Sequence, residues 1–192
     1  MEKEKRLIKW KNLFILITLI FLIVLISFTI FIVTPEKIVE KIGLKNSYFV
    51  LWFFAFLGGT SILFPFPYYL FTFSFGAAGL NPLLLGISAG LGTLIGDATT
   101  YFLAYFGRKT LSKKNPKFLE KMLDIATKNK FQFMIFAFLY ASFIPLSDDL
   151  IMIPAGIIKY PYKRLAISMG LGKIFLNTMI AFAGFYGWNI LN

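Results

Sequence analysis

The sequence predicts an all-α polytopic membrane protein: an inverted repeat of a re-entrant (broken) hairpin plus a transmembrane helix, preceded by one N-terminal transmembrane helix. Three observations lead to this prediction. Hydrophobic residues make up 58% of the 192 positions, and the charged residues gather in a few blocks between apolar runs. Prolines interrupt two of these runs. The chain also matches itself at an offset of 80 residues, which predicts two copies of one unit.

The composition narrows the range of functions. The chain has no Cys and no His, which excludes disulfides and thiol catalysis and removes the commonest metal ligand. We therefore expect no cofactor, no bound metal and no enzyme activity. The net charge of +11 arises from Lys and Arg that flank the apolar runs, which indicates membrane topology and not nucleic-acid binding. The expected partners are membrane lipids, with anionic headgroups at the basic loops.

The first domain, residues 1–47, contains the N-terminal transmembrane helix. A basic tail at 1–12 is followed by an uncharged run at 13–33, about 21 residues long, which suits one bilayer crossing. The run ends before Pro35 without the small-residue site at which a signal peptide is cleaved, so we expect a retained helix with a cytoplasmic N-terminus. A short interfacial linker at 34–47 follows.

The second domain, residues 48–192, holds both repeats. The first repeat, at 48–107, opens with an uncharged run that Pro65 and Pro67 interrupt, and it continues in a helix at 83–106. Irregular backbone inside a membrane is stable only where protein or water satisfies its polar groups. The pattern therefore predicts a polar interior.

One face of the helix at 83–106 is predicted to contact protein. Small and polar residues recur along it at three- and four-residue steps: Gly86, Gly90, Thr93, Asp97, Tyr101 and Ala104. The larger residues lie elsewhere and are predicted to face lipid: Leu85, Leu91, Leu94, Ile95 and Phe102. Gly90 and Gly92 each belong to a G-x-x-x-G spacing, which lets another helix approach closely.

A basic loop at 108–130 separates the two repeats. The second repeat, at 131–190, follows the same plan, with a run that Pro145 and Pro154 interrupt and then a helix at 165–191.

The 80-residue offset aligns residues at which backbone geometry restricts the choice: Pro65 with Pro145, Gly76 with Gly156, Gly90 with Gly170, and Gly92 with Gly172. Together with Pro67, these are the expected structural residues. The positive-inside bias places the N-terminus and the loop 108–130 in the cytoplasm, with Arg108 at the membrane edge. The two units are then inverted relative to each other, an arrangement typical of transporters that alternate access around a central site.

Three motifs resemble the DedA superfamily, also called the VTT or SNARE-associated Golgi protein family. They are a proline-containing segment that ends in A-A-G (Pro65 to Gly79), an L-G-x-x-x-G-D-x-x-x-Y run with a later Gly (Leu91 to Gly107), and a P-L-x-D-D segment that ends in A-G (Pro145 to Gly156). The resemblance covers about residues 48–190. It implies a membrane protein that scrambles or carries phospholipid or polyprenyl-phosphate, with proton coupling, and it implies that Asp97 and Tyr101 bind substrate or protons.

Two of the motifs depart from the pattern of bacterial DedA members. Tyr68 and Tyr69 stand where a Glu is typical, and Asp148 stands where the second motif has an Arg. The chain resembles a branch that carries an Asp-Asp pair.

Asp148 and Asp149 lie in an otherwise apolar run, where an unpaired charge is costly. One interpretation is that they cap a half-helix beginning near Leu150 by accepting hydrogen bonds from its free N–H groups. The other is that one of them exchanges a proton during transport or binds a cationic headgroup. The sequence leaves both interpretations open.

Asp97 and Lys173 also have two interpretations. They form a structural ion pair between the two repeat helices, or Lys173 holds a lipid phosphate while Asp97 competes for it. The offset pairs Thr93 with Lys173 and Asp97 with Asn177, which adds Asn177 to the candidate substrate- or proton-binding residues.

The combined prediction is an integral membrane lipid transporter, flippase- or scramblase-like, in a prokaryotic plasma membrane. Two alternatives remain. One is a membrane scaffold in which the charges only lock helices together. The other is an intramembrane aspartyl protease with Asp97 and Asp148 as its dyad, which is less favoured because the residues from Leu94 to Asp97 lack the expected G-x-G-D.

Overall fold

The computed structural model describes residues 35–60, 67–111, 120, 124, 129–144 and 147–191. The helices in these ranges are α2 (Pro35–Ile42), α3 (Leu44–Gly59), α4 (Tyr68–Ala77), α5 (Pro82–Leu111), α7 (Lys130–Phe143), α8 (Asp149–Ile157) and α9 (Tyr162–Leu191). The described ranges contain no β-strand, which confirms the all-α prediction. Pro67 is the N-cap residue of α4. The predicted helix at 13–33, Pro65 and Pro145 lie outside the described residues.

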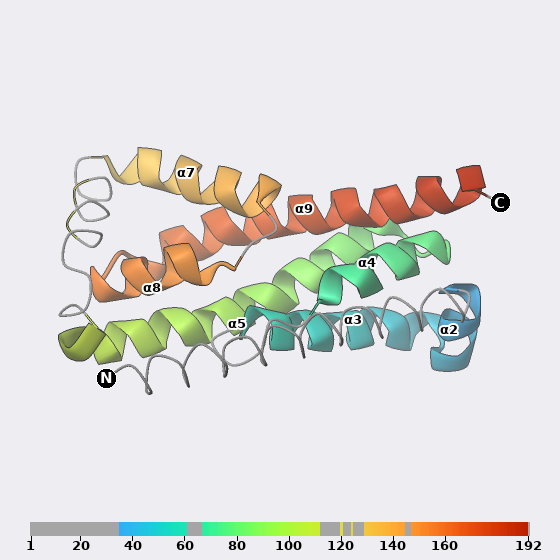
Figure 1. Ribbon diagram of the computed structural model, residues 1–192, viewed down its shortest axis with the longest axis horizontal. Helices are drawn as coiled ribbons and strands as arrows, with labels where there is room; N and C mark the ends of the chain where they lie inside the picture. Colours follow the sequence, from blue (N-terminus) through green and yellow to red (C-terminus); the bar gives the residue numbers. More distant parts are fainter. Residues whose placement is uncertain are drawn as a thin grey trace, which may run out of the picture.

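Two long antiparallel helices, α5 and α9, form the centre of the molecule (Figure 1). Each contains an apolar stretch long enough to cross a bilayer, Pro82–Arg108 in α5 and Tyr162–Gly187 in α9. Their backbones approach each other at Gly90, where a Cβ would meet backbone atoms of Ile174. This close approach is the role that the G-x-x-x-G spacing predicts.

The shorter helices form a hairpin at each end of the long pair, α3 with α4 at one end and α7 with α8 at the other (Figure 1). Helix α4 packs on α9, and α8 packs on α5. Gly76 of α4 faces the backbone of Ala181, and Gly156 of α8 faces the backbone of Tyr101, with no room for a Cβ at either glycine. The two contacts are related by the 80-residue offset on both sides, so the two units pack in the same way.

The outer helices α3 and α7 also make matching contacts with the long pair. Gly92 packs against Ala55 of α3, and Gly172 packs against Ala141 of α7. Each outer helix also accepts one side-chain hydrogen bond from its long helix: Ser88 Oγ donates to the Tyr48 carbonyl, and Ser168 Oγ donates to the Met134 carbonyl. The glycines therefore set the spacing of all four outer elements.

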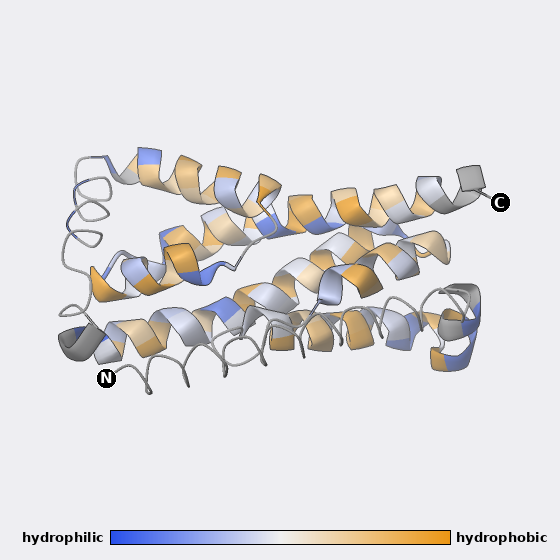
Figure 2. Ribbon diagram, viewed as in Figure 1, coloured by the Kyte–Doolittle hydropathy of each residue, from blue (hydrophilic) through white to orange (hydrophobic). Residues whose placement is uncertain are grey.

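The polar stripe predicted on α5 is confirmed, since all six of its members are buried. Leu91, Ile95 and Phe102 are exposed, as expected of residues that face lipid. The prediction for Leu85 is wrong, because this side chain is fully buried in a cluster with Leu51 of α3. Figure 2 shows that hydrophobic residues dominate both long helices, and that hydrophilic segments interrupt them near the middle.

Several helix ends differ from the predictions. Helix α5 runs past 83–106 into the predicted loop 108–130, because the Arg and Lys there are good helix formers, and α9 begins earlier than predicted. Helix α3 begins at Leu44, inside the predicted linker, because Gly43 with φ 88 ends α2. Pro154 lies inside α8 without ending it. Its missing N–H removes one hydrogen bond, and packing of the buried helix on α5 compensates for this loss.

We expect Gly156→Ala to destabilise the protein by about 1–3 kcal/mol, because the added methyl group would push α8 away from the α5 backbone. The unfolding midpoint of the purified protein in detergent measures the change. Gly187→Ala is the matched control, since nothing lies within 4 Å of its added Cβ and Ala is the better helix former. Equal midpoints for the two variants would contradict the close packing of α8 on α5.

Candidate functional site between the long helices

A buried ion pair joins α8 to α9. Lys173 Nζ lies 2.6 Å from Asp148 Oδ2, and the two side chains are only 2% and 7% exposed. Asp148 is the N-cap residue of α8, where the free N–H groups and the helix dipole favour a carboxylate. Lys173 lies more than two turns inside α9, between the apolar ends of that helix. A charge at this depth is stable only because it is paired.

Helix α4 supplies a second contact to the same ammonium group. Lys173 Nζ donates a hydrogen bond of 3.2 Å to the Tyr69 hydroxyl and lies 6.0 Å from the centroid of the Tyr69 ring. Lys173 therefore connects the two short helices, α4 and α8, to the long helix α9. This contact brings the two repeats together at one point.

Asp97 brings α5 into the same cluster. Its side chain is 1% exposed and lies within hydrogen-bonding reach of the Asp148 carboxyl. Asp97 Oδ2 and Asp148 Oδ1 are both buried, and neither has a donor among the described residues. Two carboxylate oxygens cannot hydrogen bond to each other unless a proton lies between them. The two carboxyl groups together therefore offer a site for one shared proton.

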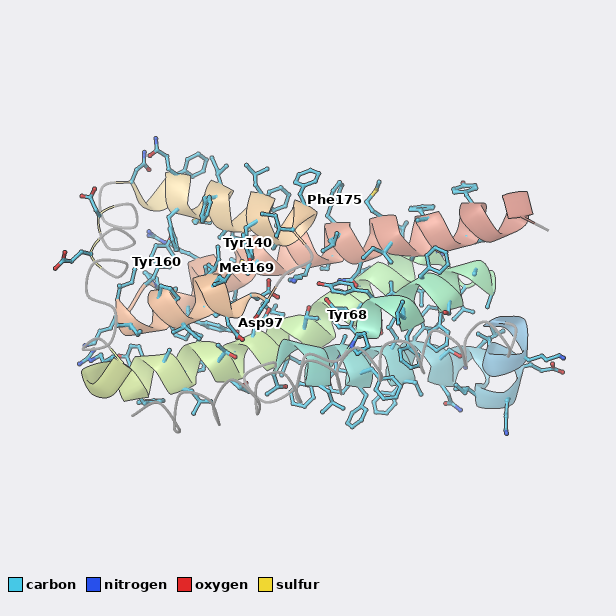
Figure 3. The ribbon with its side chains drawn as sticks, viewed as in Figure 1. Tyr68, Asp97, Tyr140, Tyr160, Met169 and Phe175 are labelled. Carbon is cyan, nitrogen blue, oxygen red and sulfur yellow. The ribbon has the colours of Figure 1, made fainter. Side chains whose placement is uncertain are left out.

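Amide and hydroxyl groups surround the ion pair. Asn177 Nδ2 donates to the Lys173 carbonyl at 2.8 Å, and Thr72 Oγ1 donates to Asn177 Oδ1 at 3.5 Å. The hydroxyl of Tyr68 is buried beside them. Figure 3 shows Tyr68 and Asp97 near the middle of the long axis of the molecule. The cluster is thus polar on several sides and enclosed by apolar helices.

The structure gathers four of the predicted site residues: Asp97, Asp148, Lys173 and Asn177. It places Tyr101 outside this cluster, whereas Asp149 follows Asp148 in the chain and lies close enough to Asp97 and Asp148 to interact with both electrostatically. Asp149 Oδ2 accepts a hydrogen bond of 2.9 Å from Ser147 Oγ, and the Tyr101 hydroxyl donates to the Tyr160 carbonyl at 2.5 Å. Tyr101 thereby ties α5 to the turn between α8 and α9.

Two predicted contacts need correction. Asp148 makes no side-chain hydrogen bond to the start of α8, so its interpretation as a cap alone is wrong. The predicted ion pair between Asp97 and Lys173 is also wrong, because Lys173 pairs with Asp148. Thr93, the repeat counterpart of Lys173, donates to the Gly90 carbonyl at 3.0 Å within its own helix.

Sequence reasoning missed Tyr68, Tyr69 and Thr72 as members of the site. A signal was present, because the 80-residue offset makes the tyrosine pair the counterpart of Asp148 and Asp149. Since the two short helices pack equivalently, residues that align in the repeat approach the same central region.

A family model described as the VTT domain matches residues 66–186, which is more than half of the chain. The chain belongs to the VTT domain family. This is the domain of the DedA and SNARE-associated Golgi protein family, so the predicted resemblance is confirmed. The matched range of this VTT domain contains every residue of the central cluster. The family and the two apolar helices indicate a membrane protein. Comparison with curated proteins and with solved structures finds no match to the chain.

We expect Lys173→Met to destabilise the VTT domain by about 3–5 kcal/mol, because it leaves Asp148 buried without its cation. The double variant Lys173→Met with Asp148→Asn removes both charges and should recover a large part of this loss. A double-mutant cycle on the unfolding midpoints in detergent measures the coupling. Losses that simply add would show that the two side chains do not interact.

Proposed function

We propose that this VTT-domain protein is an integral membrane lipid transporter, flippase- or scramblase-like, that moves phospholipid or polyprenyl-phosphate between leaflets. One observation carries the proposal. Lys173, Asp148 and Asp97 lie together, buried, between two helices that are each long and apolar enough to cross a bilayer. Ionisable groups inside a membrane are costly and typically mark the path of a substrate or a proton.

The arrangement of the cluster favours transport over a purely structural role. A buried ion pair can often be replaced by apolar side chains without loss of stability, so a scaffold has little need for one. This cluster contains more than an ion pair, because it has two carboxyl groups for one ammonium group. One oxygen of each carboxyl group has no hydrogen-bond donor among the described residues. Such a site is able to accept a proton or to exchange partners.

The proposed topology supplies access from both sides. The α3–α4 hairpin and the α7–α8 hairpin start from opposite ends of the long pair and meet near its middle (Figure 1). With a cytoplasmic N-terminus and the basic loop 108–130 also cytoplasmic, the two hairpins become re-entrant segments from opposite leaflets, an inverted repeat. Rocking of one hairpin against the long pair would then expose the cluster to each leaflet in turn. This topology makes the protein multi-pass, and the proposed location is a prokaryotic plasma membrane.

The chemistry of the cycle is an exchange of partners at Lys173. A lipid phosphate that enters the cluster replaces Asp148 as the anion on the Lys173 ammonium. The hydrogen bond from Lys173 to the Tyr69 hydroxyl holds that ammonium in position. Asp148, released from the cation, then takes up one proton from the aqueous side and shares it with Asp97. When the phosphate leaves, the proton is released and the Lys173–Asp148 pair forms again. No covalent bond is made or broken, in keeping with a transporter and not an enzyme.

One observation bears on the protease alternative. Asp97 and Asp148 lie close together, as an aspartyl dyad requires. However, the Lys173 ammonium lies 2.6 Å from one of the two carboxyl groups. It occupies the place at which a protease would bind its attacking water. The lipid-transport proposal accounts for all three residues, and the protease alternative accounts for two.

We expect Asp148→Asn to slow lipid movement by about tenfold to a hundredfold, the equivalent of one lost charged hydrogen bond. The assay follows acyl-labelled fluorescent phosphatidylglycerol in proteoliposomes as dithionite bleaches the outer leaflet. Glu40→Gln, which neutralises an exposed carboxylate on α2, is the control and should keep the wild-type rate. If the wild-type protein moves no lipid, or if Asp148→Asn matches the control, the transport proposal fails.

We expect a proton gradient across the vesicle membrane to change the rate of the wild-type protein and to leave Asp97→Asn unaffected. An amide at this position cannot share a proton with Asp148. The same assay, run with potassium and valinomycin to hold the membrane potential at zero, separates the gradient from the potential. A wild-type rate that ignores the gradient would contradict proton coupling and leave passive transport in place.

A further inference from the structure

A lysine occupies a backbone position that favours glycine at the end of α8. Lys159 has φ 58, in the left-handed region that residues other than Gly, Asn and Asp rarely adopt. The Lys159 N–H donates to the Gly156 carbonyl at 3.1 Å, and the Tyr160 N–H donates to the Ala155 carbonyl at 2.9 Å. These two bonds form a Schellman motif, whose left-handed residue is usually Gly.

The equivalent turn in the first repeat has the expected residue. Gly79 follows α4 with φ 82, and its N–H donates to the Gly76 carbonyl at 2.9 Å. Because Lys159 is exposed and lies 80 positions after Gly79, the backbone of this turn does not need the lysine side chain. The conformational cost of a lysine here points to a use for its ammonium group.

The Lys159 side chain reaches a second cation on the same aromatic ring. Lys159 Nζ and Arg108 Cζ each lie 5.8 Å from the centroid of the Tyr105 ring, so the two charges are no more than twice that distance apart. Each cation is attracted to the ring, but the two repel each other. An anion bound between or beside them would remove that repulsion.

The position of this pair fits a membrane surface. Arg108 is the last residue of the apolar stretch of α5, and Tyr162 is the first of the stretch in α9, at the same end of the antiparallel pair. Two more exposed cations, Lys163 and Arg164, follow in the first turn of α9. The corresponding turn between α4 and α5 has no charged residue. Positive-inside topology explains an excess of cations at one end, but it does not explain a lysine in a left-handed conformation.

We propose that Arg108 and Lys159, which both contact the Tyr105 ring, form a docking site for the phosphate headgroup of an anionic phospholipid at the membrane edge, together with Lys163 and Arg164 in the first turn of α9. This basic rim is separate from the central cluster and does not depend on transport. The occupant is a membrane lipid, because the cations lie where two apolar, exposed helix surfaces end and a headgroup region begins.

The test titrates the purified full-length protein, in a neutral detergent, with short-chain phosphatidylglycerol and follows the unfolding midpoint. The wild-type midpoint should rise and then saturate, as expected for a ligand that binds the folded state. Phosphatidylcholine and inorganic phosphate should leave it unchanged. A response to inorganic phosphate equal to that of phosphatidylglycerol would overturn the assignment to a lipid.

Lys159→Gly is the decisive variant. Without lipid, its midpoint should equal or exceed that of the wild type, because glycine suits the left-handed turn. With lipid, the variant should need about fivefold more phosphatidylglycerol for the half-maximal shift, because it has lost one cation that attracts the anionic headgroup. Arg108→Gln should show the same loss, and Lys45→Ala, an exposed cation on α3, should show none. An unchanged titration for Lys159→Gly, or a lower midpoint without lipid, would overturn the proposal.

Discussion

The fold depends on a constraint at its centre, which is that the ammonium of Lys173 must have an anion within an apolar interior. Asp148, the N-cap residue of α8, supplies this anion, with its Oδ2 2.6 Å from Lys173 Nζ. Tyr69 of α4 accepts a hydrogen bond from the same ammonium. The ion pair and this hydrogen bond can form together only if the two short helices and α9 meet at one place. The close helix packing at glycines brings them there, because each absent Cβ lets one backbone rest on another.

The two repeats share a backbone plan and differ in chemistry. The contacts of Gly76 and Gly156 are equivalent, as are those of Gly92 and Gly172. The side chains nearest the centre break this equivalence, since Lys173 stands opposite a threonine in the other repeat and Asp148 opposite a tyrosine. A symmetric frame therefore encloses one asymmetric site.

The same asymmetry extends to the turns at the two ends. The turn after α4 has glycine in its left-handed position and no charge, whereas the turn after α8 has Lys159 beside Arg108. The centre and the rim thus offer cations in different surroundings. Lys173 is enclosed and already paired, while the rim lies at the ends of the apolar stretches of α5 and α9.

The sequence by itself determined the class of fold, the long helices and the buried stripe of α5, because helical periodicity and apolar length are local properties. It also located Asp97, Asp148 and Lys173 as charges that need partners. Only the tertiary structure decided which partners they have. Lys173 pairs with Asp148 and not Asp97, and Leu85 is buried, because these contacts depend on how helices distant in the chain are rotated and packed. Spacing along one helix does not contain that information.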